Sequence, residues 1–323
     1  MSELRYHPYL DQWVITATHR QDRTFLPPAD YNPLAPTLPG GFPTEVPFPE
    51  YDIVVFENKF PSLSPNPPAP AVAGTALCPV RSASGVCEVV CYSQLLDSTF
   101  ATLPFSQIRK LARVWRERFV DLAAREDVKY VYIFENKGRE IGVTLFHPHG
   151  QIYAYPFIPP TAQVEVQQES QHWAQHGTPL MAAVLAESSG QIVAENDTAC
   201  AFVPFFARYP YEVYVTPKVH RPDLGTLSDA ELDDFAEMMH VVTQKYDALF
   251  GFSMPYIMAM HQRPAKSDLP GAWLHAEFYP PYRTAQKLKY LAGSEAGAGA
   301  FINDTLAEVT AETLRALPPY RSR

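Results

Sequence analysis

The stretch Phe146-His147-Pro148-His149-Gly150-Gln151-Ile152-Tyr153 contains two histidines two residues apart, followed by a glycine and a glutamine. In an extended backbone, alternate side chains point to the same face, so we expect His147, His149 and Gln151 on one face. Gly150 is expected to leave room for a ligand to approach the main chain. A neutral imidazole beside an amide suits attack on an electrophile such as phosphorus. The alternative is a pair of metal-ligating or core histidines, but such a five-residue pattern is rarely met by chance.

The composition limits the classes of function. The chain has 323 residues, of which 46% are hydrophobic, enough for one large domain or two small ones. The net charge of -9 argues against a nucleic-acid partner, although a local cluster of basic residues could still bind phosphate. No stretch approaches the apolar length of a membrane span, and we expect no signal peptide. The four cysteines form no Cys-x-x-Cys pair, which indicates a reduced, cytoplasmic protein.

The first half of the chain shows the pattern of an α+β unit. Residues 27–71 are so rich in proline that they predict an irregular arm (the proline-rich arm) rather than a helix. Apolar, β-branched runs predict strands at residues 53–56, 86–92 and 130–134, and a turn at 136–138. One apolar stripe predicts a helix over 106–124. The strand that carries His149 closes the unit.

The same order returns in the second half. Residues 192–196 resemble 54–58, residues 212–215 resemble 88–91, and 273–279 align with 147–153. A second helix starts with the capping box Ser228-x-x-Glu231, and a strand is expected at 255–260. We interpret this as a duplication, with halves at residues 1–185 and 186–323. The two copies are expected to form one mostly antiparallel sheet with helices packed on one side.

The histidine stretch, together with Phe134-Glu135-Asn136-Lys137-Gly138, resembles galactose-1-phosphate uridylyltransferase, the transferase branch of the histidine-triad (HIT-like) superfamily. The match runs from Arg20 to about Asn303. The resemblance implies a duplicated HIT-like half-barrel and a ping-pong reaction. His149 would take the uridylyl group from UDP-glucose and pass it to galactose 1-phosphate. It also implies a homodimer in which each site is completed by the partner chain.

The resemblance assigns roles to further residues. A main-chain carbonyl near His147 would hold the other ring nitrogen of His149. The spacing of Arg20 and Arg23 alone favours a solvated turn, but the resemblance implies that both contact phosphates. Lys289 and Glu295 match positions that hold the sugar and its phosphate. The remaining residues expected to bind substrate carry amide or hydroxyl groups: Gln151, Asn58, Asn136 and Thr144.

Members of this family carry two metal sites, and both are altered here. At the N-terminal zinc site Asn32, Ala35 and Leu96 replace three ligands and only His147 remains, so we expect no zinc there. The second site would consist of Glu165, His261, His275 and Glu277, with Glu277 standing where other members have His. Carboxylate is an acceptable ligand for iron or zinc, so one structural metal is expected. The alternative is a polar, hydrogen-bonded cluster without metal.

Three alternative functions stay open. One is a hydrolase of the same superfamily, although Gln151 stands where those enzymes have a third His and cannot shuttle protons. Another is a transferase or phosphorylase of the family that acts on a different nucleotide sugar or sugar phosphate. Ser294 and Phe301 favour it, because both depart from residues found in the sugar-recognition segment of the family. The third is a non-catalytic nucleotide-sensing protein, which the intact His149 and Gln151 argue against.

Overall fold

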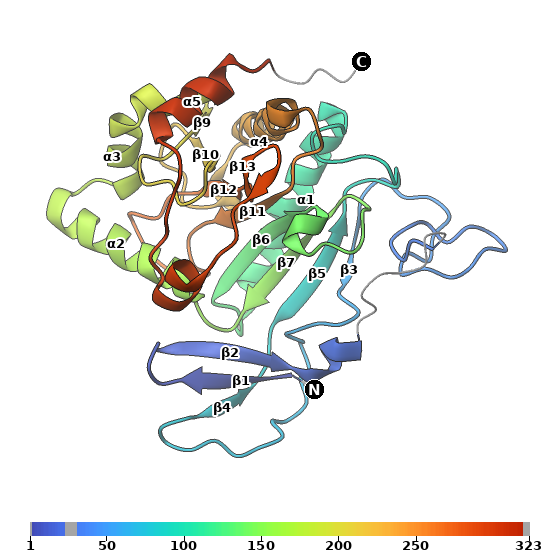
Figure 1. Ribbon diagram of the computed structural model, residues 1–323. Coiled ribbons are helices and arrows are strands. Elements are labelled where there is room, and N and C mark those ends of the chain that lie inside the picture. Colours follow the sequence, from blue (N-terminus) through green and yellow to red (C-terminus); the bar gives the residue numbers. More distant parts are fainter. Residues whose placement is uncertain (1, 23–30, 319–323) are drawn as a thin grey trace.

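The computed structural model of the protein describes residues 2–22 and 31–318 (Figure 1). Its centre is a nine-stranded sheet with the order β3-β5-β7-β6-β11-β12-β10-β9-β8, in which every pair of neighbours is antiparallel. The strands are β3 (Val54–Glu57), β5 (Val86–Cys91), β6 (Tyr130–Lys137), β7 (His149–Tyr155), β8 (Ile192–Glu195), β9 (Ala199–Phe202), β10 (Val213–Pro217), β11 (Tyr256–His261) and β12 (His275–Tyr279). The predicted α+β class with a continuous antiparallel sheet is confirmed.

Smaller elements surround this sheet. A three-stranded sheet and a short hairpin use β1 (Ser2–His7), β2 (Gln12–Ala17), β4 (Val80–Ser82), β13 (Tyr282–Thr284) and β14 (Lys287–Leu288). The helices are α1 (Phe105–Ala124), α2 (Pro160–His176), α3 (Leu180–Glu187), α4 (Asp229–Phe250) and α5 (Ala307–Ala316). None of the helices in the described ranges is both long enough and apolar enough to cross a membrane.

The sheet order shows the duplication directly. The first copy contributes β3-β5-β7-β6 and the second contributes β9-β10-β12-β11, and the two copies meet where β6 pairs with β11. The strand next to β5 is β3, and the strand next to β10 is β9. The counterpart of β3 is therefore β9, and the predicted match of residues 192–196 with 54–58 was wrong. The strand β8 is an additional edge strand of the second copy.

The pairing register also corrects the sequence alignment of the two copies. Val90 lies opposite Gly150, and Val215 lies opposite Ala276. Residues 88–91 therefore correspond to 213–216, one residue later than the sequence comparison predicted. The difference matters because a shift of one residue moves every side chain of a strand to the other face.

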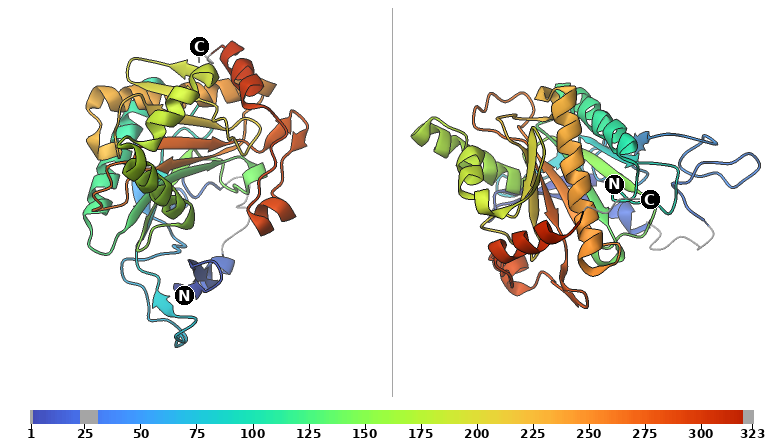
Figure 2. Two further views of the ribbon diagram at one scale, coloured as in Figure 1. Left: turned by 90° about the vertical axis from the view of Figure 1, so that its left-hand side faces the viewer. Right: turned by 90° about the horizontal axis from the view of Figure 1, so that it is seen from above.

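The two faces of the sheet are covered differently. The amphipathic helices α1 and α4 lie side by side on one face, where their apolar residues join the largest core cluster (Figure 2, right). Arg109 and Arg113 of α1 form ion pairs with Asp233 of α4, and the predicted capping box at Ser228 and Glu231 starts α4. On the opposite face α3 packs Met181 against Phe202 and Tyr214. Each long helix thus leaves the other face of its own copy available for side chains with chemical roles.

Two local expectations differ from the structure. Asn136 and Lys137 do not form a turn, because β6 continues to Lys137 by pairing with Tyr256 of β11. The strand β7 begins only at His149, so His147 precedes it. Between residues 31 and 53 the proline-rich arm contains turns and one isolated bridge between Pro36 and Val46, as its proline content predicted.

Candidate active site

The start of β7 faces a polar pocket of about 260 Å³ on the side of the sheet opposite α1 and α4. Five of the side chains expected to act on substrate line it together. Arg20 reaches it from the N-terminal segment, and the others come from β6, β7 and the loop between them: Asn136, Thr144, His149 and Gln151. Phe134 and Tyr153 add aromatic walls. The sequence therefore identified most of the polar lining of one pocket.

His149 has a defined tautomer. Its Nδ1 lies 2.7 Å from the main-chain oxygen of His147, as the family resemblance implied. A carbonyl oxygen can only accept a hydrogen bond, so Nδ1 carries the proton. In the neutral ring Nε2 then holds the lone pair, which is the arrangement that a nucleophilic imidazole requires.

The Gln151 amide is oriented by a chain of hydrogen bonds. The main-chain N–H of Phe60 donates to Asn58 Oδ1 at 2.9 Å, so the nitrogen of the Asn58 amide faces the other way. This Nδ2 donates to Gln151 Oε1 at 3.2 Å. The Nε2 group of Gln151 is consequently the end left to donate toward the pocket. Asn58 thus acts on the site through Gln151, although it does not itself line the pocket among the described residues.

Arg20 is held in place by its own contacts. Its Nη1 donates to the Phe60 carbonyl at 2.9 Å and to Ser62 Oγ at 3.0 Å. The guanidinium has further N–H donors to offer an anion. Arg23, the second arginine expected here, lies outside the described residues.

His147 differs from its neighbour His149. Its ring is 2% exposed and is enclosed by the proline-rich arm, where Tyr51 Oη lies 2.6 Å from Nε2. Burial, together with the nearby His149 ring, outweighs the opposing effect of the Ser93 main chain and lowers the pKa of His147 to about 4, so the ring is neutral. The sequence predicted both rings on one face of an extended strand. In the structure His147 precedes β7, and its carbonyl is what contacts the His149 ring.

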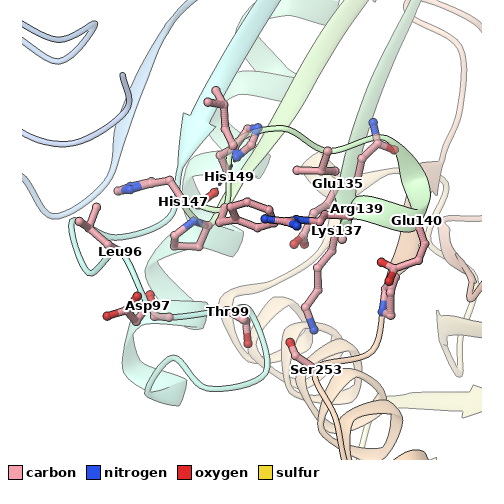
Figure 3. A pocket seen from close by; sticks show the side chains of 18 residues that line it. Leu96, Asp97, Thr99, Glu135, Lys137, Arg139, Glu140, His147, His149 and Ser253 are labelled. Atoms are coloured by element: carbon pink, nitrogen blue, oxygen red, sulfur yellow. Dashed lines mark hydrogen bonds between the residues drawn. The ribbon is translucent and has the colours of Figure 1, made fainter. Parts of the chain in front are cut away.

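A second pocket, of about 390 Å³, borders the segment between β6 and β7 (residues 138–148, the catalytic loop) and is lined by residues that include His147, His149, Lys137 and Glu135. Figure 3 shows Leu96 and His147 at one end of it and Glu140 at the other. Glu135 is 4% exposed, and its Oε2 accepts hydrogen bonds from the hydroxyls of Tyr92 and Tyr256. Burial raises the pKa of Glu135 to about 7 against the opposing effect of Lys137 and the two hydroxyls.

Gly150 has a structural reason to be glycine. A Cβ placed there would lie 2.2 Å from Tyr92 Oη and 3.0 Å from the Phe134 carbonyl oxygen. Both contacts are too short for any larger residue. The sequence predicted that Gly150 makes room for a ligand. The structure shows that it makes room for Tyr92, on the core side of the sheet.

The second copy carries the predicted cluster of possible metal ligands. Glu165 reaches it from α2, His261 ends β11, and His275 and Glu277 lie on β12, with their ligand atoms all within 4.8 Å of one another. His275 Nδ1 lies 3.0 Å from the Trp273 carbonyl, which leaves Nε2 as the ligand atom. An imidazole held by a carbonyl in this way is the usual arrangement of a metal-ligating histidine. The donor set of two nitrogens and two carboxylates therefore fits a transition metal.

The cluster favours positive charge. Burial lowers the pKa of His261, but the Glu165 and Glu277 carboxylates outweigh it and raise this pKa to about 9. Burial raises the pKa of Glu277, but His261, His275 and Arg208 outweigh it and lower this pKa to about 2. Arg208 Nη2 forms an ion pair with Glu277 Oε2 at 2.8 Å. Carboxylates so arranged stabilise either a protonated imidazole or a bound cation.

Lys289 and Glu295 lie together but away from the pocket that contains His149. Both side chains are buried, and Lys289 Nζ lies 3.1 Å from Glu295 Oε1. Lys289 also donates to the Ile302 carbonyl. Within the described part of one chain, the structure therefore does not bring the predicted sugar-binding pair to His149.

Sequence reasoning missed several residues of these sites. Tyr51 contacts His147, Glu135 supports β7 through Tyr92, and Arg208 pairs with Glu277. Glu169 lines a small cavity beside Glu165 and the two histidines of the cluster. Its position on α2, one turn after Glu165, is a signal that could have identified it. Tyr51 lies in an irregular segment, where no such periodicity exists.

The fold and the pocket define the class of the protein. It is a duplicated α+β protein of the histidine-triad type that presents one imidazole nitrogen to amide, hydroxyl and guanidinium donors. Models described as the N-terminal and C-terminal domains of galactose-1-phosphate uridyl transferase match residues 1–159 and 165–323. The chain belongs to the galactose-1-phosphate uridylyltransferase family.

Individual relatives agree with this assignment. A galactose-1-phosphate uridylyltransferase of Thermotoga maritima is 39% identical over 98% of each chain, and one of Rattus norvegicus is 34% identical over 98% of this chain and 87% of that one. A solved uridylyltransferase structure has a TM-score of 0.89 at 34% identity, covering 97% of this chain and 98% of that chain. An ADP-glucose phosphorylase from Arabidopsis thaliana, 24% identical with a TM-score of 0.73 over 98% of this chain and 100% of that chain, shares the fold.

Proposed function

We propose that the protein is a UDP-glucose–hexose-1-phosphate uridylyltransferase that acts through a covalent uridylyl group on His149. The observation that carries the proposal is the hydrogen bond of 2.7 Å between His149 Nδ1 and the His147 carbonyl, beside a pocket of phosphate-binding donors. The names of the relatives agree with it, since galactose-1-phosphate uridylyltransferases match nearly the whole chain.

In the first half-reaction the lone pair of His149 Nε2 attacks the α-phosphorus of UDP-glucose. The bond between this phosphorus and the bridging oxygen breaks, and the electron pair leaves with glucose 1-phosphate. The proton on Nδ1 stays in its hydrogen bond to the His147 carbonyl, which stabilises the positive charge that the ring gains. The Gln151 amide, the Thr144 hydroxyl and the Arg20 guanidinium are placed to donate to the phosphoryl oxygens.

In the second half-reaction a phosphate oxygen of galactose 1-phosphate attacks the same phosphorus. The P–N bond breaks, its electron pair returns to Nε2, and UDP-galactose leaves. The phosphoramidate conserves the free energy of the broken anhydride between the two steps. No general base is required at position 151, because the attacking oxygen already belongs to a phosphate anion.

Incubation with UDP-glucose radiolabelled in its UMP part tests the proposal. We expect an acid-labile label on the protein, released glucose 1-phosphate, and loss of the label on addition of galactose 1-phosphate. A wild-type protein that takes up no label under these conditions would contradict the covalent mechanism. Release of UMP without an acceptor would indicate the hydrolase instead.

A different sugar phosphate or nucleobase is the second candidate, with the same chemistry. The observation that favours it is that Ser294 and Phe301 make contacts with their own chain. Ser294 Oγ donates to the Ala300 carbonyl, and the Phe301 ring packs over the Arg208 guanidinium and against Tyr209. Both side chains thus make contacts within the chain. Transfer rates from UDP- and ADP-glucose to a panel of hexose 1-phosphates would separate the two candidates.

A structural metal in the second copy is part of the proposal. Glu165, His261, His275 and Glu277 would hold one zinc or iron ion, which would fix α2 to β11 and β12. The N-terminal zinc site is proposed to be absent, because Asn32, Ala35 and Leu96 offer no thiolate or imidazole. Such an ion would lie in the copy that lacks the nucleophile, and we propose no part for it in the transfer.

We also propose a homodimer with shared active sites. The segment that follows Lys289 carries apolar side chains in solvent, namely Tyr290 at 70% exposure, Leu291 at 47% and Ile302 at 57%. A second copy that covers this surface could bring the segment to the partner's pocket. In mixed dimers, a His149→Gly chain and a Lys289→Ala chain would then complement each other, whereas neither variant would be active alone.

A further inference from the structure

Three segments of the chain meet at the hydroxyl of Tyr51. Its Oη lies 2.6 Å from His147 Nε2, 3.0 Å from the Ser93 carbonyl and 3.2 Å from the Leu34 carbonyl. Leu34 belongs to the proline-rich arm, Ser93 follows β5, and His147 belongs to the catalytic loop. One hydroxyl thus connects the arm, the sheet and the loop. The resemblance to the family placed a zinc ion among the same segments.

The direction of each hydrogen bond follows from the neighbouring Asn32. The Leu34 N–H donates to Asn32 Oδ1 at 2.9 Å, so the Asn32 amide presents its nitrogen to His147 Nδ1, 3.4 Å away. Nδ1 is then an acceptor, and the proton of the neutral ring lies on Nε2. This Nε2–H donates to Tyr51 Oη, and the Tyr51 O–H donates to the carbonyl of Ser93 or Leu34. Both ring nitrogens of His147 and the Tyr51 hydroxyl thus have suitable partners.

Apolar side chains surround one side of this network. Leu34, Val89 and Cys91 form a buried cluster, and Tyr51 and Leu145 pack against it. Burial raises the pKa of Tyr51 well above its ordinary value, with a further contribution from Cys91, so the hydroxyl stays protonated as a donor. A hydrogen bond at such a site is held in one geometry.

We infer that Tyr51 is a positioning residue that replaces a metal ion in holding the catalytic loop, with Asn32 fixing the tautomer of His147. The side chain of His147 is held by Tyr51, and its carbonyl holds His149 Nδ1. Displacement of the His147 ring would therefore shift or rotate the His149 ring. The inference rests on the proposed function of His149 as the nucleophile.

The test is a single-turnover measurement on the full chain with UDP-glucose radiolabelled in its UMP part. In Tyr51→Phe the hydroxyl is lost while the ring is kept, so the pocket walls stay in place. We expect the rate of label formation to fall about 10- to 100-fold, as for a small misplacement of a reacting group, with the KM for UDP-glucose changed less than about twofold.

Tyr246→Phe is the matched control. Tyr246 is fully buried on α4, and its hydroxyl donates to the Tyr211 carbonyl at 2.7 Å, away from the pocket. Both variants lose an O–H···O=C hydrogen bond, and Tyr51→Phe also loses the bond from His147 Nε2–H, so both should lower Tm. Only Tyr51→Phe should slow the labelling. A Tyr51→Phe protein that has a lower Tm but is labelled at the wild-type rate would overturn the inference.

Asn32→Asp provides a second variant that keeps the shape of the side chain. The carboxylate presents only acceptors to His147 Nδ1, so it opposes the tautomer in which Nε2 donates to Tyr51. We expect slower labelling, and a ¹⁵N spectrum of the labelled histidines that shows a changed protonation state of His147. Wild-type labelling with an unchanged spectrum would contradict the network. A wild-type protein that takes no label would instead contradict the proposed function itself.

Discussion

The strands β7 and β12 are equivalent strands of the two copies. Their first histidines are oriented in the same way but lie in different surroundings. In both, a histidine at the start of the strand has its Nδ1 close to the carbonyl of the residue two positions earlier, at 2.7 Å for His149 and 3.0 Å for His275. In the neutral form of each ring the lone pair therefore lies on Nε2, although Glu277 also stabilises the protonated form of His275. What differs is the residue two positions later, which is Gln151 in one copy and Glu277 in the other.

The surroundings of each histidine determine whether its Nε2 faces a substrate pocket or a buried cluster of possible metal ligands. Gln151 is held by Asn58 and lines a pocket of about 260 Å³, in which a phosphate has room. Glu277 is 2% exposed, and its Oε1 lies 3.3 Å from His275 Nε2, in a cluster with a cavity of only about 10 Å³ beside it. Such a cavity has space for an ion or a water molecule but for no substrate. The backbone supplies an oriented imidazole, while space and charge select a substrate or a cation.

The largest expected effect separates the two histidines. His149→Gly should reduce covalent labelling and turnover below detection, because no other imidazole presents Nε2 to this pocket among the described residues. His275→Gly should keep the label but lower Tm and metal content, since its ring lies in the buried cluster. Label retained in His149→Gly would end the nucleophile assignment.

Replacing the Gln151 amide by an imidazole introduces a group that can transfer protons. Gln151→His should raise the ratio of UMP to nucleotide sugar formed from UDP-glucose by about 10²-fold, the lower end of general acid–base catalysis. The imidazole could deprotonate water that attacks the uridylyl-histidine, which the amide cannot do. Chromatography of the products with and without galactose 1-phosphate measures the ratio. An unchanged ratio would mean that exclusion of water protects the intermediate.

Glu277→Ala tests whether the buried cluster of the second copy binds a cation. The change leaves Arg208 without its closest carboxylate, although Glu212 remains 3.6 Å from the guanidinium. We expect a loss of about 3 kcal/mol in stability, the lower end for a broken buried pair, together with loss of metal. Metal analysis should find one equivalent per wild-type chain. In Glu277→Ala the Tm should fall clearly, while the labelling rate should stay close to that of the wild type. Two equivalents would contradict the absent N-terminal zinc site.

Gly150 and Ala276 give a fourth contrast. A methyl group at 150 would meet Tyr92 Oη at 2.2 Å, and Tyr92 is fixed between Phe100 and Trp115. Gly150→Ala should therefore lower stability by about 1–3 kcal/mol, the range for overpacking. In the second copy the register puts Pro217 in the place of Tyr92, and Ala276 is tolerated. Adding Tyr92→Phe should restore part of the loss in Gly150→Ala. No recovery would show that the Phe134 carbonyl is the decisive contact.

The sequence predicted the features that depend on local pattern. The apolar stripe of α1, the capping box of α4 and the motif that carries His149 and Gln151 were found because periodicity and spacing encode them. The sequence did not reveal the contacts that depend on distant segments. The extension of β6 to Lys137 requires β11, and the match of β3 with β9 requires the sheet order.

Residues that act through others were the hardest to predict. Tyr51 belongs to no motif, and its contact with His147 depends on the path of an irregular arm. The sequence indicated that three zinc ligands were missing but not which group had replaced the ion. Arg208 could not be predicted either, because it lies between β9 and β10 and its role depends on Glu277 of β12. Lone polar residues of this kind gain a role only from the tertiary structure.

The smallest expected effect concerns Glu135, which occupies in β6 the position that the buried Met260 occupies in β11 of the second copy. Burial raises the pKa of Glu135 to about 7 from an ordinary value of 4.5. Between these two pH values the folded protein holds a proton that the unfolded chain has lost, so stability falls as the pH rises through this window. Glu169 and Glu212 have pKa values raised to about 7 as well, also by burial, so Glu135 supplies only part of the fall.

Glu135→Gln keeps the shape of the side chain and a hydrogen-bond acceptor for Tyr92 and Tyr256, but it cannot titrate. The decline of Tm between pH 5 and pH 7 should therefore become shallower, because one of the buried carboxyls that cause it no longer titrates. Glu140→Gln, an exposed change on the rim of the same pocket, should leave the decline unchanged. Thermal unfolding at several pH values measures both slopes. If Glu135→Gln declined as steeply as the wild type, Glu135 would already be ionised in the folded protein, and Lys137 and the two hydroxyls would outweigh the effect of burial.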